Sequence, residues 1–231
     1  MRQNVYEYSF AMQKERNSKI ARTFFVVVGV ILFISLFLNF ILFPCLVRSD
    51  SMESDIAKNS AVFVTPLDKN PNRGDVFFIA PQEENNLAFY KVFLNKFVAF
   101  FTFQQFEPFS YSKKSTERSS LRRVIGLPGD KIYIQDYIAY VKPQEEKFFL
   151  TEFELSSRPY NIHIYSVPAE WDGLGVLENM KEIELGADEY FVLADNRIEA
   201  TDSRVYGTVC KNRIKGRALL EYFPFNKIRI F

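Results

Sequence analysis

The sequence contains very few of the residues that build disulfide frameworks and metal sites. Among its 231 residues are two cysteines, Cys45 and Cys210, and a single histidine, His163. Two cysteines so far apart do not make a disulfide framework, so we expect both to be free thiols. The sequence shows no metal-ligand spacing and no phosphate-binding loop, so we expect neither a metal nor another cofactor.

An excess of charge of one sign is also missing. The 29 Lys and Arg residues are balanced by 28 Asp and Glu residues, which leaves a formal net charge of +1. This balance gives no electrostatic reason to expect a nucleic acid or an acidic substrate as the partner. We therefore expect no nucleic-acid binding.

One long hydrophobic run lies near the N-terminus. From Thr23 to Val47 the sequence has no charged residue and consists mostly of Phe, Val, Ile and Leu. A helix needs about 20 apolar residues to cross a bilayer core, whereas the apolar region of a removable signal peptide has only about 7–15. The run therefore predicts a retained transmembrane helix over residues 23–47.

Positive charges flank this run unevenly. Only Arg48 follows it closely, whereas the preceding segment carries Arg2, Lys14, Arg16, Lys19 and Arg22. Because positive residues remain on the cytoplasmic side of a membrane, we expect residues 1–22 to be cytoplasmic. Residues 48–231 should then form an extracytoplasmic domain of a single-pass protein in the lipid bilayer.

Beyond residue 60 the chain consists of short extended segments between turn signals. β-branched and aromatic residues dominate these segments, and Gly, Pro, Asn and Asp separate them, which favours strands joined by loops. The expected strands are Ser60–Pro66, Val76–Ile79, Leu121–Leu127, Lys131–Val141, Asn161–Val167, Glu189–Leu193 and Ala218–Phe223. The predicted fold is mainly β.

The segment from Leu87 to Phe106 is the exception, and three interpretations fit it. Its length and apolar spacing suit an amphipathic helix, its Phe and Val content suits a strand, and its aromatic residues suit the membrane interface. Lys91 and Lys96 interrupt it, so it is too short to be a second membrane span.

Three segments follow the membrane run in a specific order. They are Ser49-Asp50-Ser51-Met52, then Arg122-Arg123-Val124-Ile125-Gly126-Leu127-Pro128-Gly129-Asp130, and then Ala194-Asp195-Asn196-Arg197 continuing through Thr201-Asp202-Ser203-Arg204 to Gly207. Each is unspecific alone, but their order and spacing together resemble the type I signal peptidase (leader peptidase) family, over about residues 20–223. Arg73-Gly74-Asp75-Val76 is a fourth segment that supports the same resemblance more weakly.

This resemblance implies a signal-peptidase-like β catalytic domain, in which residues 135–187 form a smaller inserted subdomain. It also implies a serine endopeptidase that removes signal peptides from exported preproteins at the bacterial cytoplasmic (inner) membrane. By the same resemblance, Ser51 is the nucleophile and Ser49 is the oxyanion-hole serine. Ser51 follows the apolar run closely, which suits a protease that cuts where a translocated chain leaves the bilayer.

The expected base does not match the family. A serine nucleophile needs one, and the position of the family's catalytic lysine is Arg122. Arginine starts above about pKa 12.5 and offers donors but no acceptor when charged, so Arg122 is a poor general base. Ala200 replaces the serine that orients the lysine. A triad with His163 is disfavoured because His163 belongs to the inserted region.

The residues that support the site match the family pattern better than the residues of the reaction centre do. The Asp195-Asn196-Arg197 turn is present, and so are Asp202 and Arg204, which form an ion pair in the family. A relocated lysine is an alternative base, and the candidates are Lys91, Lys96, Lys113, Lys114 and Lys131.

Three functional hypotheses follow. The first is a signal peptidase that uses Ser51 with unusual or relocated base chemistry. The second is a catalytically silent homologue that binds precursors or assists an active paralogue. The third is a self-cleaving regulatory protein with Ser-Lys chemistry, and the membrane anchor argues against it.

Overall fold

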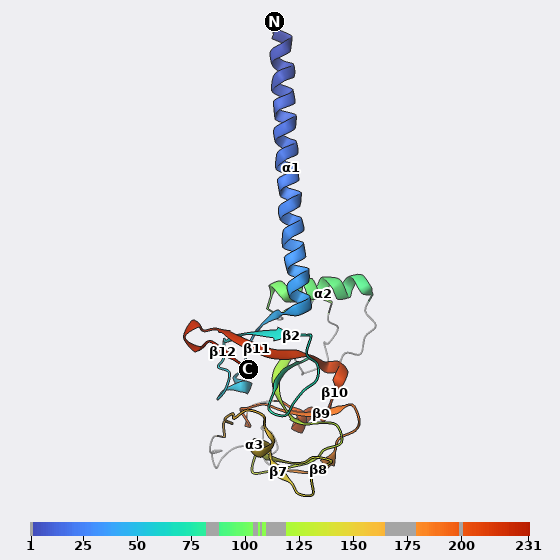
Figure 1. Ribbon diagram of the computed structural model, residues 1–231, viewed down its shortest axis with the longest axis vertical. Helices are drawn as coiled ribbons and strands as arrows, with labels where there is room; N and C mark the ends of the chain where they lie inside the picture. Colours follow the sequence, from blue (N-terminus) through green and yellow to red (C-terminus); the bar gives the residue numbers. More distant parts are fainter. Residues whose placement is uncertain are drawn as a thin grey trace. The chain divides into compact units, whose positions relative to one another are not determined.

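The computed structural model describes residues 2–81, 88–103, 106, 108–109, 119–164, 179–198 and 201–231 (Figure 1). It divides into two units, Met1–Phe40 and Ile41–Phe231. The first unit belongs to one long helix, and the second contains the strands. The mainly β fold predicted from the sequence is confirmed.

The long helix, α1 (Arg2–Ile41), contains one stretch that is apolar enough and long enough to cross a membrane. This stretch is Met12–Ile34. The helix ends at Ile41, although the uncharged run that was expected to form a helix continues to residue 47.

The end of the uncharged run belongs to the β domain. Phe43–Leu46 forms strand β1, which pairs with strand β2 (Ala61–Thr65). Pro44 has no backbone N–H and cannot continue a helix, while Phe43 and Cys45 are buried in the core of the domain. Hydrophobicity alone did not distinguish a helix in lipid from a buried strand.

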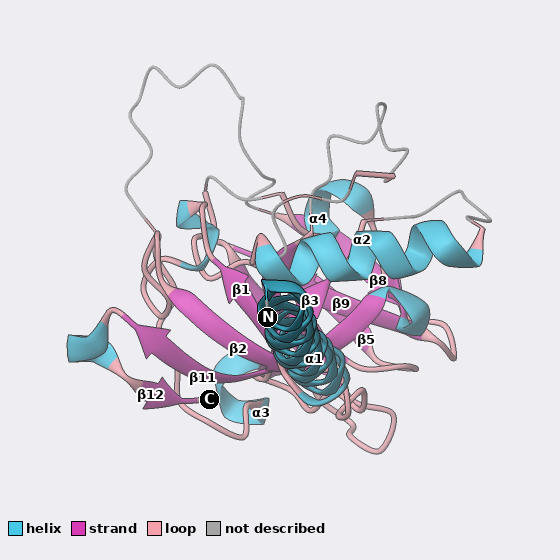
Figure 2. Ribbon diagram, turned by 90° about the horizontal axis from the view of Figure 1, so that it is seen from above, coloured by secondary structure: helices cyan, strands magenta, loops and turns pink. Residues whose placement is uncertain are grey.

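The larger sheet is antiparallel and has the strand order β1-β2-β11-β3-β4-β9-β10, with β12 paired to β11. Its further strands are β3 (Val76–Ile79), β4 (Ser120–Gly126), β9 (Glu189–Leu193), β10 (Val209–Cys210), β11 (Ile214–Phe223) and β12 (Arg229–Ile230). In Figure 2, β2 lies between β1 and β11, so the last long strand of the chain lies beside one of the first.

A second, four-stranded sheet has the order β7-β6-β5-β8. Its strands are β5 (Lys131–Gln135), β6 (Ile138–Lys142), β7 (Leu150–Thr151) and β8 (Met180–Glu184). It overlaps the expected insertion at residues 135–187, and the whole of Ile41–Phe231 forms one compact unit. The separate inserted subdomain remains a prediction.

The remaining elements are short, apart from one helix. They are α2 (Phe89–Phe101), α3 (Glu152–Leu155), α4 (Ser203–Tyr206) and the 3-10 turns η1 (Asp50–Met52), η2 (Lys211–Arg213) and η3 (Phe225–Lys227). For residues 87–106 the structure has a helix, Phe89–Phe101, rather than a strand, and the membrane-interface interpretation stays a prediction. Leu87, Gln104 and Gln105 lie outside the described residues.

Two expected strands differ from the structure. Lys131–Val141 is a hairpin of β5 and β6 rather than one strand, because Asp136 and Tyr137 both have positive φ (50° and 65°) and reverse the chain. Of Asn161–Val167, only His163 forms a bridge, with Asn196, and residues 165–167 lie outside the described part of the chain.

Three buried clusters hold the domain together. One contains side chains of β1, β2, β3, β4 and β11 together with Met52 and Ile56 from the η1 region. The second packs the four-stranded sheet against β4 and β9. The third includes Phe77, Val124 and Ile214 of the large sheet. The η1 turn is therefore fixed to the large sheet by its own buried side chains.

Candidate active site

Ser51 lies in the η1 turn, directly after β1. Its neighbour Met52 is completely buried and anchors the turn in the core. The backbone N–H of Asn196 donates to the carbonyl oxygen of Ser51 at 3.0 Å, and Asn196 Nδ2 donates to the carbonyl oxygen of Asp50 at 3.3 Å. Met52 and Asn196 thus fix the position of Ser51, and only 7% of Ser51 is exposed.

Two side chains reach the hydroxyl of Ser51. Ser49 Oγ lies 2.8 Å from Ser51 Oγ, and Arg122 Nη1 donates to Ser51 Oγ at 3.0 Å. Arg122 comes from β4, where it is paired with Phe77 of β3 inside the large sheet. The fold therefore brings together three residues that the sequence singled out, two of which are 71 positions apart.

The other N–H groups of Arg122 point at backbone oxygens. Nη1 also donates to the carbonyl oxygen of Leu121 at 2.6 Å, while Nε and Nη2 donate to that of Thr201 at 3.1 and 2.7 Å. Arg122 is itself buried. These contacts fix the guanidinium in one orientation beside Ser51.

This environment leaves Arg122 charged. Burial lowers the pKa of its guanidinium, whereas Tyr206 and Asp202 act in the opposite direction. The guanidinium of arginine is so strong a base that neutralising it at pH 7 would cost roughly 7 kcal/mol. The carbonyl acceptors also favour the charged donor form. Arg122 can stabilise negative charge on Ser51 Oγ, but it takes no proton from it.

The next residue, Arg123, supports the site from the protein interior. It forms a two-bond ion pair with Asp195 (Nε–Oδ1 2.8 Å and Nη2–Oδ2 2.6 Å) and also contacts Asp55 at 2.7 Å. The ring of Tyr160 lies 4.0 Å from its guanidinium carbon. Burial alone would lower the pKa of Arg123, but the two carboxylates outweigh it and raise the pKa. Arg123 is therefore a permanent structural cation.

Two more buried ion pairs lie in the third sequence segment. Arg204 forms a two-bond pair with Asp202 (2.9 and 2.7 Å), which is the pairing expected from the sequence. Arg197 is fully buried and donates to Glu152 Oε2 at 2.5 Å. The hydroxyl of Tyr160 donates to the same oxygen at 2.6 Å. These pairs hold the segment that contacts the Ser51 turn.

Two of the candidate replacement lysines have contacts away from Ser51. Lys131 pairs with Glu184 in the second sheet at 3.3 Å, and Lys91 Nζ lies 5.9 Å from the ring of Phe109. The side chain of Lys96 is not among those described, and three positions lie outside the described residues: Lys113, Lys114 and Ala200. Lys58 pairs with Asp50 at 2.9 Å, and its side chain is about half exposed.

His163 lies beside the site segment through its backbone. Its N–H donates to the carbonyl oxygen of Asp195 at 2.8 Å, and its carbonyl accepts from the N–H of Arg197 at 3.0 Å. It therefore runs next to Asn196, which holds the Ser51 turn. Among the residues that the structure describes, no group of three or more His, Cys, Asp or Glu side chains is placed to hold a metal.

A family model described as signal peptidase, peptidase S26, matches residues 18–223. The chain belongs to this family. The predicted resemblance is thus confirmed over nearly the whole sequence.

Several bacterial signal peptidases are similar to this chain. Signal peptidase I P of Bacillus subtilis subsp. natto is 27% identical over 208 residues, which cover 88% of both chains. Signal peptidase I of Bacillus amyloliquefaciens is 31% identical over 110 residues, or 47% of this chain and 54% of that protein. A solved signal peptidase I from Enterococcus faecalis V583 has 19% identity and a TM-score of 0.31, covering 64% of this chain and 96% of that one. The chain thus spans about half the length of some signal peptidases and most of another.

The contacts of four residues of this signal peptidase family member were not predicted from the sequence, although Thr201 belongs to the third segment. Glu152 and Asp55 complete the buried ion pairs, Thr201 receives two bonds from Arg122, and Tyr160 contacts both networks. A capping box at the start of α3, in which Thr151 and Glu154 cap each other, was the one local signal near Glu152. The capping box predicts where a helix starts, but it does not predict that Glu152 pairs with Arg197.

Proposed function

We propose that the protein is a membrane-bound serine endopeptidase that removes signal peptides from exported preproteins, with Ser51 as the nucleophile. The observation that carries this proposal is the meeting of Ser49, Ser51 and the residue at the base position, Arg122, around one hydroxyl. Membership of the signal peptidase family supports the substrate class.

In this proposal Ser51 Oγ attacks the scissile carbonyl carbon, the peptide C–N bond breaks as the leaving amine takes up a proton, and water then hydrolyses the acyl-enzyme. Ser49 Oγ donates to the developing oxyanion, an interaction worth about 3 kcal/mol of transition-state stabilisation when the donor is well placed. Arg122 lowers the energy of the Ser51 oxygen as it becomes negative. The Ser51 proton must pass to an acceptor other than Arg122.

The need for a proton acceptor other than Arg122 also favours a second function. Because Arg122 Nη1 donates to Ser51 Oγ and cannot accept its proton, the chain fits a catalytically silent homologue that binds precursors or assists an active paralogue. In this case the domain recognises a signal peptide without cutting it.

The proposed location is the bacterial cytoplasmic membrane. The uncharged part of α1 from Thr23 onward, which overlaps the candidate span Met12–Ile34, would anchor the protein, with residues 1–22 in the cytoplasm and the β domain outside. The uneven distribution of positive charge around the hydrophobic run supports this orientation.

Cleavage of a labelled preprotein in detergent tests the proposal. The variants are Ser51→Ala, Arg122→Lys and His163→Gln, with Ser157→Ala as a control that removes an exposed serine hydroxyl. A working peptidase should lose cleavage in Ser51→Ala and keep it in Ser157→Ala. Loss in His163→Gln as well would indicate that the imidazole receives the Ser51 proton.

Two other outcomes distinguish the second function. No cleavage by the wild type, with cleavage appearing in Arg122→Lys, would show that the scaffold is competent and only the base is missing. No cleavage by any variant, together with binding of the precursor, would reject the peptidase and leave the silent homologue.

A further inference from the structure

Helix α2 (Phe89–Phe101) exposes large apolar side chains, which an ordinary surface helix buries. Two of the side chains that it buries against the domain are small or polar: Ala99 is 2% exposed and Asn95 is 8% exposed, and Asn95 Oδ1 accepts from the N–H of Phe109 at 2.8 Å. In contrast, Phe93 is 48% exposed and Phe101 is 51% exposed.

The exposed apolar side chains of α2 form one stripe. Positions 90, 93, 94 and 101 are spaced as one side of a helix, and they hold Tyr90, Phe93, Leu94 and Phe101. In water such a stripe would be unfavourable, because each large apolar side chain gains free energy only when it is removed from solvent. The stripe therefore needs an apolar partner.

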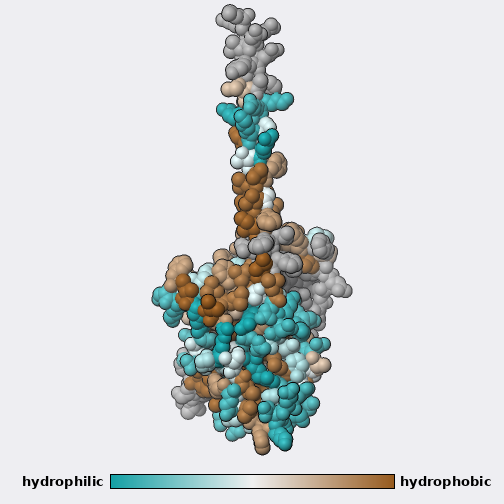
Figure 3. Space-filling model, in the orientation of Figure 1, coloured by the Kyte–Doolittle hydropathy of each residue, from teal (hydrophilic) through white to brown (hydrophobic). Residues whose placement is uncertain are grey.

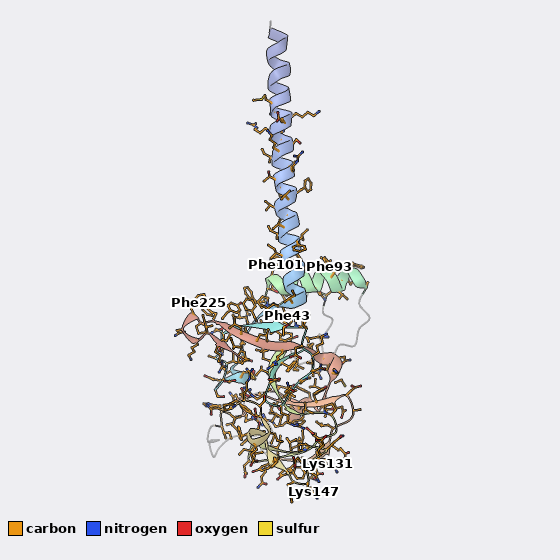
Figure 4. All side chains as sticks on the ribbon, in the orientation of Figure 1. Phe43, Phe93, Phe101, Lys131, Lys147 and Phe225 are labelled. Atoms are coloured by element: carbon orange, nitrogen blue, oxygen red, sulfur yellow. The ribbon has the colours of Figure 1, made fainter. Side chains whose placement is uncertain are left out.

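More apolar side chains lie at the same end of the Ile41–Phe231 unit. The η3 turn and β12 expose Phe225, Ile228 and Ile230. Figure 4 places Phe93, Phe101 and Phe225 at this end, and Lys131 and Lys147 at the opposite end. Figure 3 shows brown surface gathered on the η3 side of that end. Exposed apolar side chains of α2, η3 and β12 thus lie at one end of the domain, and Lys131 and Lys147 lie at the other.

The end with the exposed side chains of α2, η3 and β12 is where the chain enters the domain from α1. Ile41, the last residue of α1, is held by Thr65, whose hydroxyl donates to its carbonyl oxygen at 2.9 Å. Five residues later, the N–H of Leu46 donates to the carbonyl oxygen of Phe103, just after α2. Five extended residues span at most about 17 Å. The C-terminal end of α2 is therefore close to the point where the apolar helix ends.

We propose that α2 lies in the membrane–water interface, with its Tyr90-to-Phe101 stripe among the lipid acyl chains. The sequence of α2 contains two lysines and no acidic residue, which suits anionic headgroups. A second copy of the chain is a poorer partner. A helix of 13 residues is about 20 Å long and about 10 Å wide, so its face offers about 200 Å², whereas stable interfaces need about 800 Å² per partner.

The consequence goes beyond the proposed function, because it holds whether or not Ser51 cleaves anything. The backbone bond between Phe103 and Leu46 ties α2 to β1, and β1 leads directly to the Ser51 turn. Insertion of α2 would therefore fix the depth of Ser51 relative to the bilayer surface.

Depth-dependent fluorescence quenching of the full-length protein in vesicles tests this proposal. The one tryptophan, Trp171, is first changed to Phe, and a new tryptophan is introduced as Phe93→Trp or, at the other end of the domain, as Phe148→Trp. Phe148 is 76% exposed, so both substitutions replace an exposed phenylalanine. The vesicles contain phosphatidylcholine and phosphatidylglycerol, with acyl chains brominated near the headgroup.

We expect the tryptophan at position 93 to emit at shorter wavelength and to lose most of its emission to the brominated lipid, and the one at position 148 to do neither. Equal, unquenched emission from both positions would overturn the proposal. A blue shift without quenching that weakens as the protein is diluted in lipid would also overturn it and identify a second copy as the partner. Leu94→Trp repeats the test if Phe93→Trp does not fold.

Discussion

Glu152→Ala should remove most of the stability of the β domain. The carboxylate of Glu152 is 2% exposed and receives three hydrogen bonds: from Arg197 Nη2 at 2.5 Å, from the Tyr160 hydroxyl at 2.6 Å and from the backbone N–H of Ala139 at 3.1 Å. Burial and the charge of Glu152 raise the pKa of Tyr160, so its hydroxyl remains a donor. The substitution leaves all three donors without this acceptor.

The largest loss comes from Arg197, which is fully buried. Breaking a buried ion pair by removing one partner costs about 3–5 kcal/mol. Leaving the Tyr160 and Ala139 donors unsatisfied adds about 1–3 kcal/mol each, and partial relaxation offsets some of the sum. The expected loss of about 5 kcal/mol is comparable to the whole stability of a typical domain, about 5–15 kcal/mol.

Thermal and urea unfolding of the purified protein in detergent, followed by circular dichroism, measures this loss. Glu152→Gln keeps an acceptor and should be intermediate. The matched control is Glu154→Ala on the same short helix, because Glu154 is exposed and caps only the helix start through Thr151. If Glu152→Ala is no less stable than Glu154→Ala, the assignment of the Arg197 pair as a structural support is wrong.

Two further outcomes follow. Gly74→Ala should cost more than about 2 kcal/mol and Gly207→Ala only about 1 kcal/mol in urea unfolding, because both have positive φ but a Cβ at position 74 would lie 2.0 Å from Ser156 Oγ. At pH 8 a thiol reagent should label Cys210, which is exposed, and spare Cys45, whose pKa burial raises to about 12. The Cys45 contribution to stability is complete below about pH 8.5 and is lost as the pH rises toward 12, so Cys45→Ala should flatten the alkaline fall of the unfolding free energy; equal slopes would contradict this.

Local sequence patterns were sufficient for five strands of the large sheet. β2, β3, β4, β9 and β11 fall within or overlap expected segments, because β-branched and aromatic residues between turn signals leave few alternatives. The Asp136-Tyr137 turn was missed because Tyr137 stands where a two-residue hairpin turn usually has glycine. The helix end at Ile41 was missed because a hydrophobic run has the same composition in a buried strand as in a membrane.

The site residues that belong to the sequence motifs were predicted. The residues that only the fold brings to the site were not. The resemblance placed Ser49, Ser51 and Arg122 in one site before any geometry was known. Glu152 and Thr201 were not predicted, because their contacts with Arg197 and Arg122 join positions 45 and 79 residues apart. Such contacts depend on how the two sheets pack, and local pattern contains no information about that.

The position of β11 has a consequence for the order in which this protein matures. Residues 214–223 lie between β2 and β3, so these two earlier strands have no direct pairing with each other. If the β domain is exported as proposed, the segment with Ser51 emerges long before β11, and β11, which joins it to the Arg122 side of the sheet, emerges near the end. We expect the nascent chain to remain without a formed Ser51–Arg122 contact until about residue 223 has left the translocation channel. A precursor stalled before that point would carry the nucleophile but no assembled site.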